Sequence, residues 1–107
     1  MISMETIRAM AALIAARFNP ERVILFGSFA RGQASEESDV DLLVEVHQDE
    51  RAKGRGNPIH RALADGFLVP TDVIIRTSSS VSKHRDNPYS VVYQALREGV
   101  VLYDKRA

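Results

Sequence analysis

The chain has 107 residues, 45% of them apolar and 26% charged, which suits one soluble domain and is too short for two. Fourteen basic and fourteen acidic residues give a formal net charge of zero, so the composition offers no broad basic surface for nucleic acid. The absence of cysteine excludes disulfides and thiol catalysis, and no apolar run approaches the roughly 18 residues of a membrane helix. We expect a single cytoplasmic domain over residues 1–107, with no membrane contact and no direct nucleic-acid partner.

The N-terminal segment, residues 3–18, predicts an amphipathic helix. Apolar side chains recur there at three- and four-residue steps, with alanines between them. Ser3 is suited to the N-cap position. Asn19-Pro20 ends the pattern, because a proline cannot continue a helix.

A strand and a turn are expected next. The apolar run VILF at 23–26, bounded by Gly27, is typical of a strand buried on both faces. Residues 28–31 are expected to form a short helix with Gly32 as its C-cap. The following polar residues, 33–38, read as a loop.

A second strand is predicted over residues 39–46, DVDLLVEV. Side chains alternate between the two faces of a strand, so its residues divide into two sets. One set is Val40, Leu42, Val44 and Val46, and the other is Asp39, Asp41, Leu43 and Glu45.

The second half of the chain continues the alternation of helices and strands. The expected order is a helix over 59–67, a strand over 71–76 after Pro70, a loop over 77–86, a helix over 89–98 capped by Asn87, and a strand over 100–103. This alternation predicts an α/β (α+β) fold: a small mixed sheet with helices mainly on one face.

The two aspartates Asp39 and Asp41 are the first functional signal. Their spacing places both carboxylates on one face of a strand made otherwise of Val and Leu, where they repel each other. A divalent cation removes this conflict, since hard cations take carboxylate oxygens. A bare Asp-x-Asp is also compatible with a strand end that is simply exposed to solvent.

Two further features favour the cation. Gly27-Ser28 follows a buried strand, and the free N–H groups of such a turn, with a Ser hydroxyl, suit a phosphate. Asp72 opens the third apolar strand, and a neighbouring strand would bring it beside the aspartate pair. Three convergent carboxylates can hold two metal ions and support displacement at phosphorus.

Other basic residues leave alternatives open. Arg31 can reach a triphosphate or pair with the acidic cluster, and the sequence favours neither. The KGRG segment, residues 53–56, suits phosphate contact less well than it suits a solvated loop. Neither a P-loop nor a dinucleotide-binding glycine motif occurs.

The stretch GSFARGQASEESDVDLLVEV resembles the signature of the DNA polymerase β-like nucleotidyltransferases. That signature is Gly-Ser, about ten residues, Asp-x-Asp on a strand, and a third carboxylate on a later strand. The G-S-x-A-R-G form, the small size and the ending ALREGVVLYDK resemble the minimal nucleotidyltransferase branch. The resemblance covers nearly the whole chain and implies the nucleotidyltransferase fold.

The resemblance also implies roles for individual residues. Asp39 and Asp41 would be catalytic metal ligands for Mg²⁺ or Mn²⁺, and Asp72 would bridge to a second ion and help to activate the attacking hydroxyl. Gly27 and Ser28 would hold the triphosphate of ATP. Arg31 belongs to the same motif and is included with the nucleotide-binding residues.

The implied reaction is transfer of AMP from ATP to a hydroxyl. Minimal members of the family are often antitoxins paired with a HEPN-type toxin, and some AMPylate a tyrosine on it. The chain has no evident domain for a small acceptor, which favours a protein acceptor or a site shared between subunits of a homo-oligomer. The alternatives are an antitoxin that neutralises its partner by binding alone, and a transferase for a small-molecule acceptor.

Overall fold

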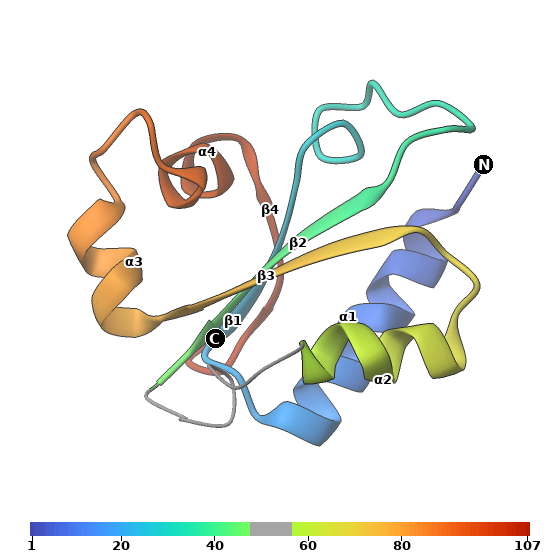
Figure 1. Ribbon diagram of the computed structural model, residues 1–107, viewed down its shortest axis with the longest axis horizontal. Coiled ribbons are helices and arrows are strands. Elements are labelled where there is room, and N and C mark those ends of the chain that lie inside the picture. The colour runs from blue at the N-terminus through green and yellow to red at the C-terminus, as the bar shows by residue number, and fades with distance from the viewer. Residues whose placement is uncertain (48–56) are drawn as a thin grey trace.

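The computed structural model describes residues 1–47 and 57–107, which form a four-stranded mixed sheet flanked by four helices (Figure 1). The strands are β1 (Arg22–Phe26), β2 (Val40–Val46), β3 (Thr71–Thr77) and β4 (Val100–Asp104). The helices are α1 (Met4–Phe18), α2 (Pro58–Gly66), α3 (Ser78–His84) and α4 (Val91–Glu98). The expected α/β class and mixed sheet are confirmed. The KGRG segment at 53–56 lies outside the described residues.

The strand order is β3-β2-β1-β4. Strand β1 pairs antiparallel with both β2 and β4, while β2 and β3 are parallel. The parallel pair is joined by a crossover that contains α2, as parallel neighbours require. Because β2 and β3 run in the same direction, their first residues lie at the same end of the sheet.

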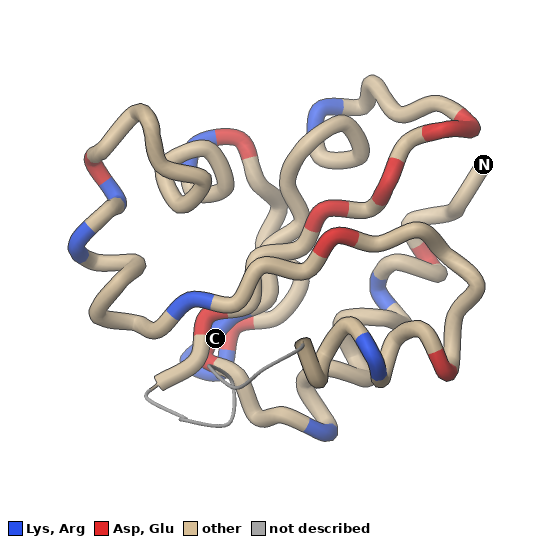
Figure 2. Tube along the Cα trace, viewed as in Figure 1, with Lys and Arg blue, Asp and Glu red and all other residues tan. Residues whose placement is uncertain are grey.

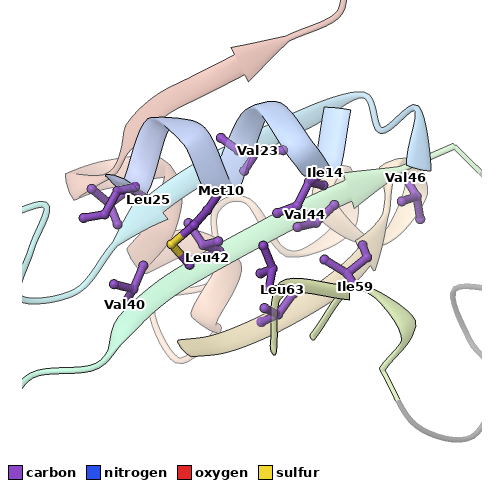
Figure 3. Close-up of a cluster of buried hydrophobic side chains, with 13 residues drawn as sticks. Met10, Ile14, Val23, Leu25, Val40, Leu42, Val44, Val46, Ile59 and Leu63 are labelled. Carbon is purple, nitrogen blue, oxygen red and sulfur yellow. The ribbon is translucent and has the colours of Figure 1, made fainter. Parts of the chain in front are cut away.

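The helices cover both faces of the sheet. Helices α1 and α2 pack on one face, and α3 and α4 on the other (Figure 1). The alternation of β2 explains this division, because its Val residues and Leu42 enter the core with α1 and α2 while Leu43 packs with Ala95 of α4. The expectation of helices mainly on one face is met only in part: the larger core lies there (Figure 3), but the sheet buries a second apolar face.

Helix α1 begins as its sequence predicts. The Ser3 hydroxyl accepts a hydrogen bond from the Thr6 N–H at 3.1 Å, which satisfies one of the free donors of the first turn. The helix ends at Asn19, whose φ of 49° is left-handed. Its apolar stripe is buried against the sheet and consists of Ile7, Met10, Ala11 and Ile14.

The segment after β1 forms consecutive turns, and the short helix expected over 28–31 is absent. The Arg31 N–H donates to the Gly27 carbonyl at 3.1 Å, and the Gln33 N–H donates to the Ser28 carbonyl at 2.9 Å. Gly32 adopts a φ of 70°, so the predicted left-handed residue is present. A reversal so soon leaves no room for a second helical turn.

Helix α3 was expected to be loop, and this expectation was wrong. Three consecutive serines have weak helix propensity. The Thr77 hydroxyl nevertheless accepts a hydrogen bond from the Ser80 N–H at 3.2 Å and caps the helix. Val81 is buried, so tertiary packing supplies what the local sequence lacks.

Helix α4 starts two residues later than predicted. Its N-cap is Ser90, whose hydroxyl accepts from the Val92 N–H at 3.1 Å. Asn87 instead forms a preceding turn, accepting the Tyr89 N–H on its side chain at 3.1 Å. Among the helices of the described residues, none combines the length and the apolar character needed to cross a bilayer.

Candidate active site

Two carboxylates face each other at one end of the sheet. Asp41 is the second residue of β2 and Asp72 is the second residue of β3, and the two are register partners in the parallel pair. Register partners on adjacent strands leave the same face of the sheet, and such strands lie about 4.8 Å apart. Figure 2 shows this end of β2 and β3 as adjoining acidic segments. The expected proximity of Asp72 to Asp41 is confirmed.

The neighbours of Asp41 distinguish it from the other acid on the same strand. Glu45 is only 4% exposed, but its register partners are Arg22 on β1 and Arg76 on β3, and its carboxylate binds the Arg22 Nε at 2.6 Å. Asp41 has Phe26 on β1 and Asp72 on β3 as its partners. Glu45 is therefore neutralised within the sheet, whereas Asp41 is not.

The electrostatics of Asp41 reflect this environment. Burial raises the pKa of the Asp41 carboxyl above its usual value, and the charges of Asp72 and Asp39 raise it further. Arg31 acts in the opposite direction and lowers the pKa. Ionised Asp41 is thus disfavoured by its surroundings, and a bound cation would relieve this.

Asp39 lies at the same end of the sheet but is less closely engaged. It immediately precedes β2 and is exposed, although its charge is felt at Asp41. Across residues 1–47 and 57–107, no three His, Asp or Glu side chains are gathered closely enough to hold a metal ion. Asp41 and Asp72 nevertheless provide the oxygen donors that Mg²⁺ and Mn²⁺ prefer, so this pair fits a hard divalent cation. The role of Asp39 as a third ligand stays a prediction.

The Gly27 turn is pressed against the Asp41 carboxylate. Gly27 has a φ of 74°, and a Cβ added there would collide with the Asp41 side chain. Only glycine therefore allows this approach without strain. The close contact brings the backbone of the Gly27-Ser28 turn beside the carboxylates, as the motif predicts, while phosphate binding by Gly27 and Ser28 stays a prediction.

Arg31 extends from the same turn and pairs with α4. Its Nη1 lies 2.9 Å from Oε1 of Glu98, and its Nε donates to Gln33 at 3.1 Å. The sequence left two roles open for Arg31: binding a triphosphate, or pairing with the acidic cluster. In the structure, Arg31 pairs directly with Glu98 and not with that cluster. Arg31 influences Asp41 through its charge while Glu98 holds it.

Glu98 and Gln94 are site neighbours that sequence reasoning missed. The Gln94 side chain donates to Oε1 of Glu98 at 2.9 Å, and this bond is the main cause that lowers the pKa of Glu98. Arg31 and the backbone N–H of Gly27 lower that pKa further. The four-residue spacing of Gln94 and Glu98 places them on one side of α4. Which side faces the turn depends on tertiary packing.

The match to a known family completes these observations. A family model described as "Polymerase beta, Nucleotidyltransferase" matches residues 9–107. The chain belongs to this nucleotidyltransferase family. The match spans the Gly27 turn and both strands that carry the aspartates, so the site described above lies entirely inside the family domain.

Two curated relatives share part of the nucleotidyltransferase sequence. "Putative protein adenylyltransferase MJ0141" of Methanocaldococcus jannaschii is 42% identical over 55 residues, which cover 51% of this chain and 54% of that protein. "Putative protein adenylyltransferase MJ1379" of the same organism is 36% identical over 45 residues, covering 42% and 45%. The matched segments thus span about half the length of these relatives.

Solved structures share the fold of this nucleotidyltransferase domain. A "putative nucleotidyltransferase" from Sulfolobus solfataricus aligns with a TM-score of 0.60 at 17% identity, over 95% of this chain and 80% of that one. A structure described as a toxin-antitoxin with AMP-PNP gives 0.61 at 19% identity, over 92% and 74%. The toxin-antitoxin MntA-HpeT, in a mutant form, gives 0.60 at 18% identity, over 98% and 76%. At these identities the likeness establishes the fold.

Proposed function

We propose that this domain is a magnesium-dependent adenylyltransferase that moves AMP from ATP to a hydroxyl on a partner protein. The observation that carries the proposal is the register pairing of Asp41 with Asp72, beside a Gly27 turn that touches the Asp41 carboxylate. A purely structural role would leave two like charges adjacent without a benefit to the fold. Family membership and relatives named as protein adenylyltransferases support the reaction class.

In the proposed reaction, the acceptor oxygen forms a bond to the α-phosphorus of ATP. The bond from that phosphorus to the bridging oxygen breaks, pyrophosphate leaves with its electron pair, and the acceptor hydroxyl would give its proton to the Asp72 carboxylate. Asp41 and Asp72 would hold Mg²⁺, with Asp39 as a further ligand, and the ion would supply charge neutralisation at the phosphates. The Gly27-Ser28 backbone and Arg31 would orient the β- and γ-phosphates.

The proposed partner is a HEPN-type toxin, which this domain would inactivate as its antitoxin in the cytoplasm. Two structural neighbours are described as toxin-antitoxin proteins, and one of them was solved with the ATP analogue AMP-PNP. Transfer requires an acceptor at about 3–3.5 Å from the reacting atom. A partner surface would supply that acceptor beside the Gly27 turn.

A second candidate function is neutralisation of the partner by contact alone. The observation in its favour is the exposed position of Asp39, which leaves Asp41 and Asp72 as a pair within the described residues. Binding alone would need none of these carboxylates. The two functions therefore differ in what happens when Asp41 or Asp72 loses its charge.

The test is intact-mass spectrometry of a co-expressed HEPN-type partner after incubation with ATP and Mg²⁺. The adenylyltransferase predicts an added AMP that disappears in Asp41→Asn and Asp72→Asn, while the complex with the partner persists. Asp65→Asn is a matched control, because Asp65 is an exposed acid on α2, which carries neither residue of the pair. Neutralisation by all variants without added mass would support the binding function instead.

A further inference from the structure

A groove lies along the exposed side of α4, and apart from Gln94 and Glu98 the residues that line it are unused by the site described so far. Its volume is about 510 Å³, and its walls include Tyr89, Tyr93, Arg97 and Glu98. Tyr89 is 97% exposed. The guanidinium carbon of Arg97 lies 5.3 Å from the centre of the Tyr93 ring. The groove therefore combines two aromatic rings with a planar cation.

Glu98 joins this groove to the Gly27 turn. It lines the groove, and its Oε1 lies 2.9 Å from the Nη1 of Arg31. Gln94 is also a wall residue, and it donates to the same Glu98 oxygen at 2.9 Å. The C-terminal end of the groove is therefore the place where Arg31 and the turn meet α4.

The length of α4 suits a ligand that spans both places. Glu98 is five positions after Tyr93, which corresponds to about 7.5 Å along a helix axis. A nucleoside attached to phosphates at the Gly27 turn would extend along this direction. Aromatic rings and arginine planes are the groups on which nucleobases stack, because every base presents a flat π face.

We propose that the α4 groove is the nucleobase subsite, in which the base stacks on Tyr93 and Arg97 while the triphosphate lies at Gly27 and Arg31. The inference rests on the proposed function, since it assigns the other half of the same nucleotide. Tyr93 and Arg97 are four residues apart, so a simpler explanation of their contact is that the pair stabilises the helix. That explanation does not account for the groove or for the exposed ring of Tyr89.

The test compares two probes on the full chain by titration calorimetry with Mg²⁺: ATP, and inorganic triphosphate, which has no base. Tyr93→Leu and Arg97→Gln should each weaken ATP binding about tenfold, the loss expected for one stacking partner. Their affinity for inorganic triphosphate should stay unchanged. Tyr93→Phe keeps the ring and should retain ATP affinity. Arg17→Gln, an exposed arginine on α1, is the matched control.

Tyr89→Ser protects the test against misfolding, because Tyr89 lies outside the helix and is almost fully exposed. This variant should also weaken the binding of ATP without weakening the binding of inorganic triphosphate. Equal losses for both probes would overturn the inference, as would ATP that binds the unchanged protein no more tightly than inorganic triphosphate. If the groove variants lose ATP affinity selectively but the unchanged protein transfers no AMP, only the proposed function is refuted. If the unchanged protein transfers AMP and every groove variant keeps its ATP affinity, only the subsite is refuted.

Discussion

Asp41 and Asp72 occupy the same level of the parallel β2–β3 pair, and the third residue at that level, on β1, is Phe26. Four residues further along β2, Glu45 lies between Arg22 and Arg76. Strand β2 thus carries a neutralised acid, Glu45, near one end and one member of an uncompensated pair, Asp41, near the other. This contrast separates a carboxylate that stabilises the fold from carboxylates that the fold tolerates for another purpose.

The charge of Asp41 should reduce the stability of the free protein. Its folded-state pKa is raised, first by burial and then by Asp72 and Asp39. Stability from the protonated form is therefore fully present below the unfolded pKa of about 3.9 and is lost as pH rises through the folded pKa. Asp41→Asn should remove this pH dependence and raise the free energy of unfolding at pH 7 by about 0.5 kcal/mol, the scale of one cross-strand pair.

Melting curves from pH 3 to pH 8 would check this prediction. The wild type and Asp41→Asn should converge in acid and separate by a few degrees at neutral pH. Asp65→Asn, on the exposed side of α2, should leave the melting curve unchanged. A lower melting temperature for Asp41→Asn at pH 7 would mean that Asp41 has a structural role.

Metal and nucleotide should bind together. Magnesium dehydrates reluctantly and shares its coordination with substrate phosphates, so Mg²⁺ alone should bind weakly. Mg²⁺ with ATP at a hundred times its Kd should stabilise the wild type by about 2.7 kcal/mol. The double change Asp39→Asn and Asp41→Asn should abolish this gain. Urea unfolding with and without the ligands measures the gain in stability, and titration calorimetry measures Mg²⁺ binding with and without ATP. Unchanged metal-dependent ATP binding by the double variant would contradict the assignment.

The glycine turn offers a matched pair of substitutions. Gly27 and Gly32 both have left-handed φ values, of 74° and 70°, but only Gly27 is in contact with a side chain where a Cβ would be added. Alanine at Gly32 should cost about 1–2 kcal/mol of stability from the backbone alone. Gly27→Ala should cost more, because its Cβ collides with the Asp41 carboxylate.

A double-mutant cycle in urea isolates this collision. In an Asp41→Ala background the colliding carboxylate is absent, so the extra cost of Gly27→Ala over Gly32→Ala should largely vanish. Equal costs of Gly27→Ala in both backgrounds would show that the contact with Asp41 does not restrict the turn.

The sequence is sufficient to predict the elements with a strong pattern. Three patterns are local in the sequence: the alternation of side chains along β2, the apolar stripe of α1, and the spacing from Gly-Ser to Asp-x-Asp. The structure has the strand, the helix and the turn that these patterns predict. Helix α3 was missed because its stability comes from the burial of Val81 and a Thr77 cap rather than from propensity. The second covered face of the sheet was hidden for a similar reason, since Leu43 and Ala95 meet only in the folded chain. Glu98 is likewise distant from Arg31 along the chain.

Removing the charge of Glu98 should strengthen the binding of triphosphate. Arg31 and Glu98 are both partly exposed, at 38% and 30% for their side chains, so solvent screens their ion pair and the pair adds little to stability. Glu98→Gln should therefore hardly change the melting temperature. It releases Arg31 from a competing anion and removes a negative charge from the phosphate turn. We expect inorganic triphosphate to bind several-fold more tightly to Glu98→Gln at low salt, and less so at high salt, where the Debye length shortens to about 3 Å at 1 M.

The Arg31→Gln background provides the control. Without the guanidinium, Glu98 no longer competes with the phosphates for Arg31. Most of the gain in triphosphate affinity from Glu98→Gln should therefore disappear. Calorimetry on the wild type, both single variants and the double variant gives the coupling between the two residues directly. Weaker triphosphate binding by Glu98→Gln would reverse the interpretation: the carboxylate would then hold Arg31 in a position that the phosphates need, rather than compete with them for it.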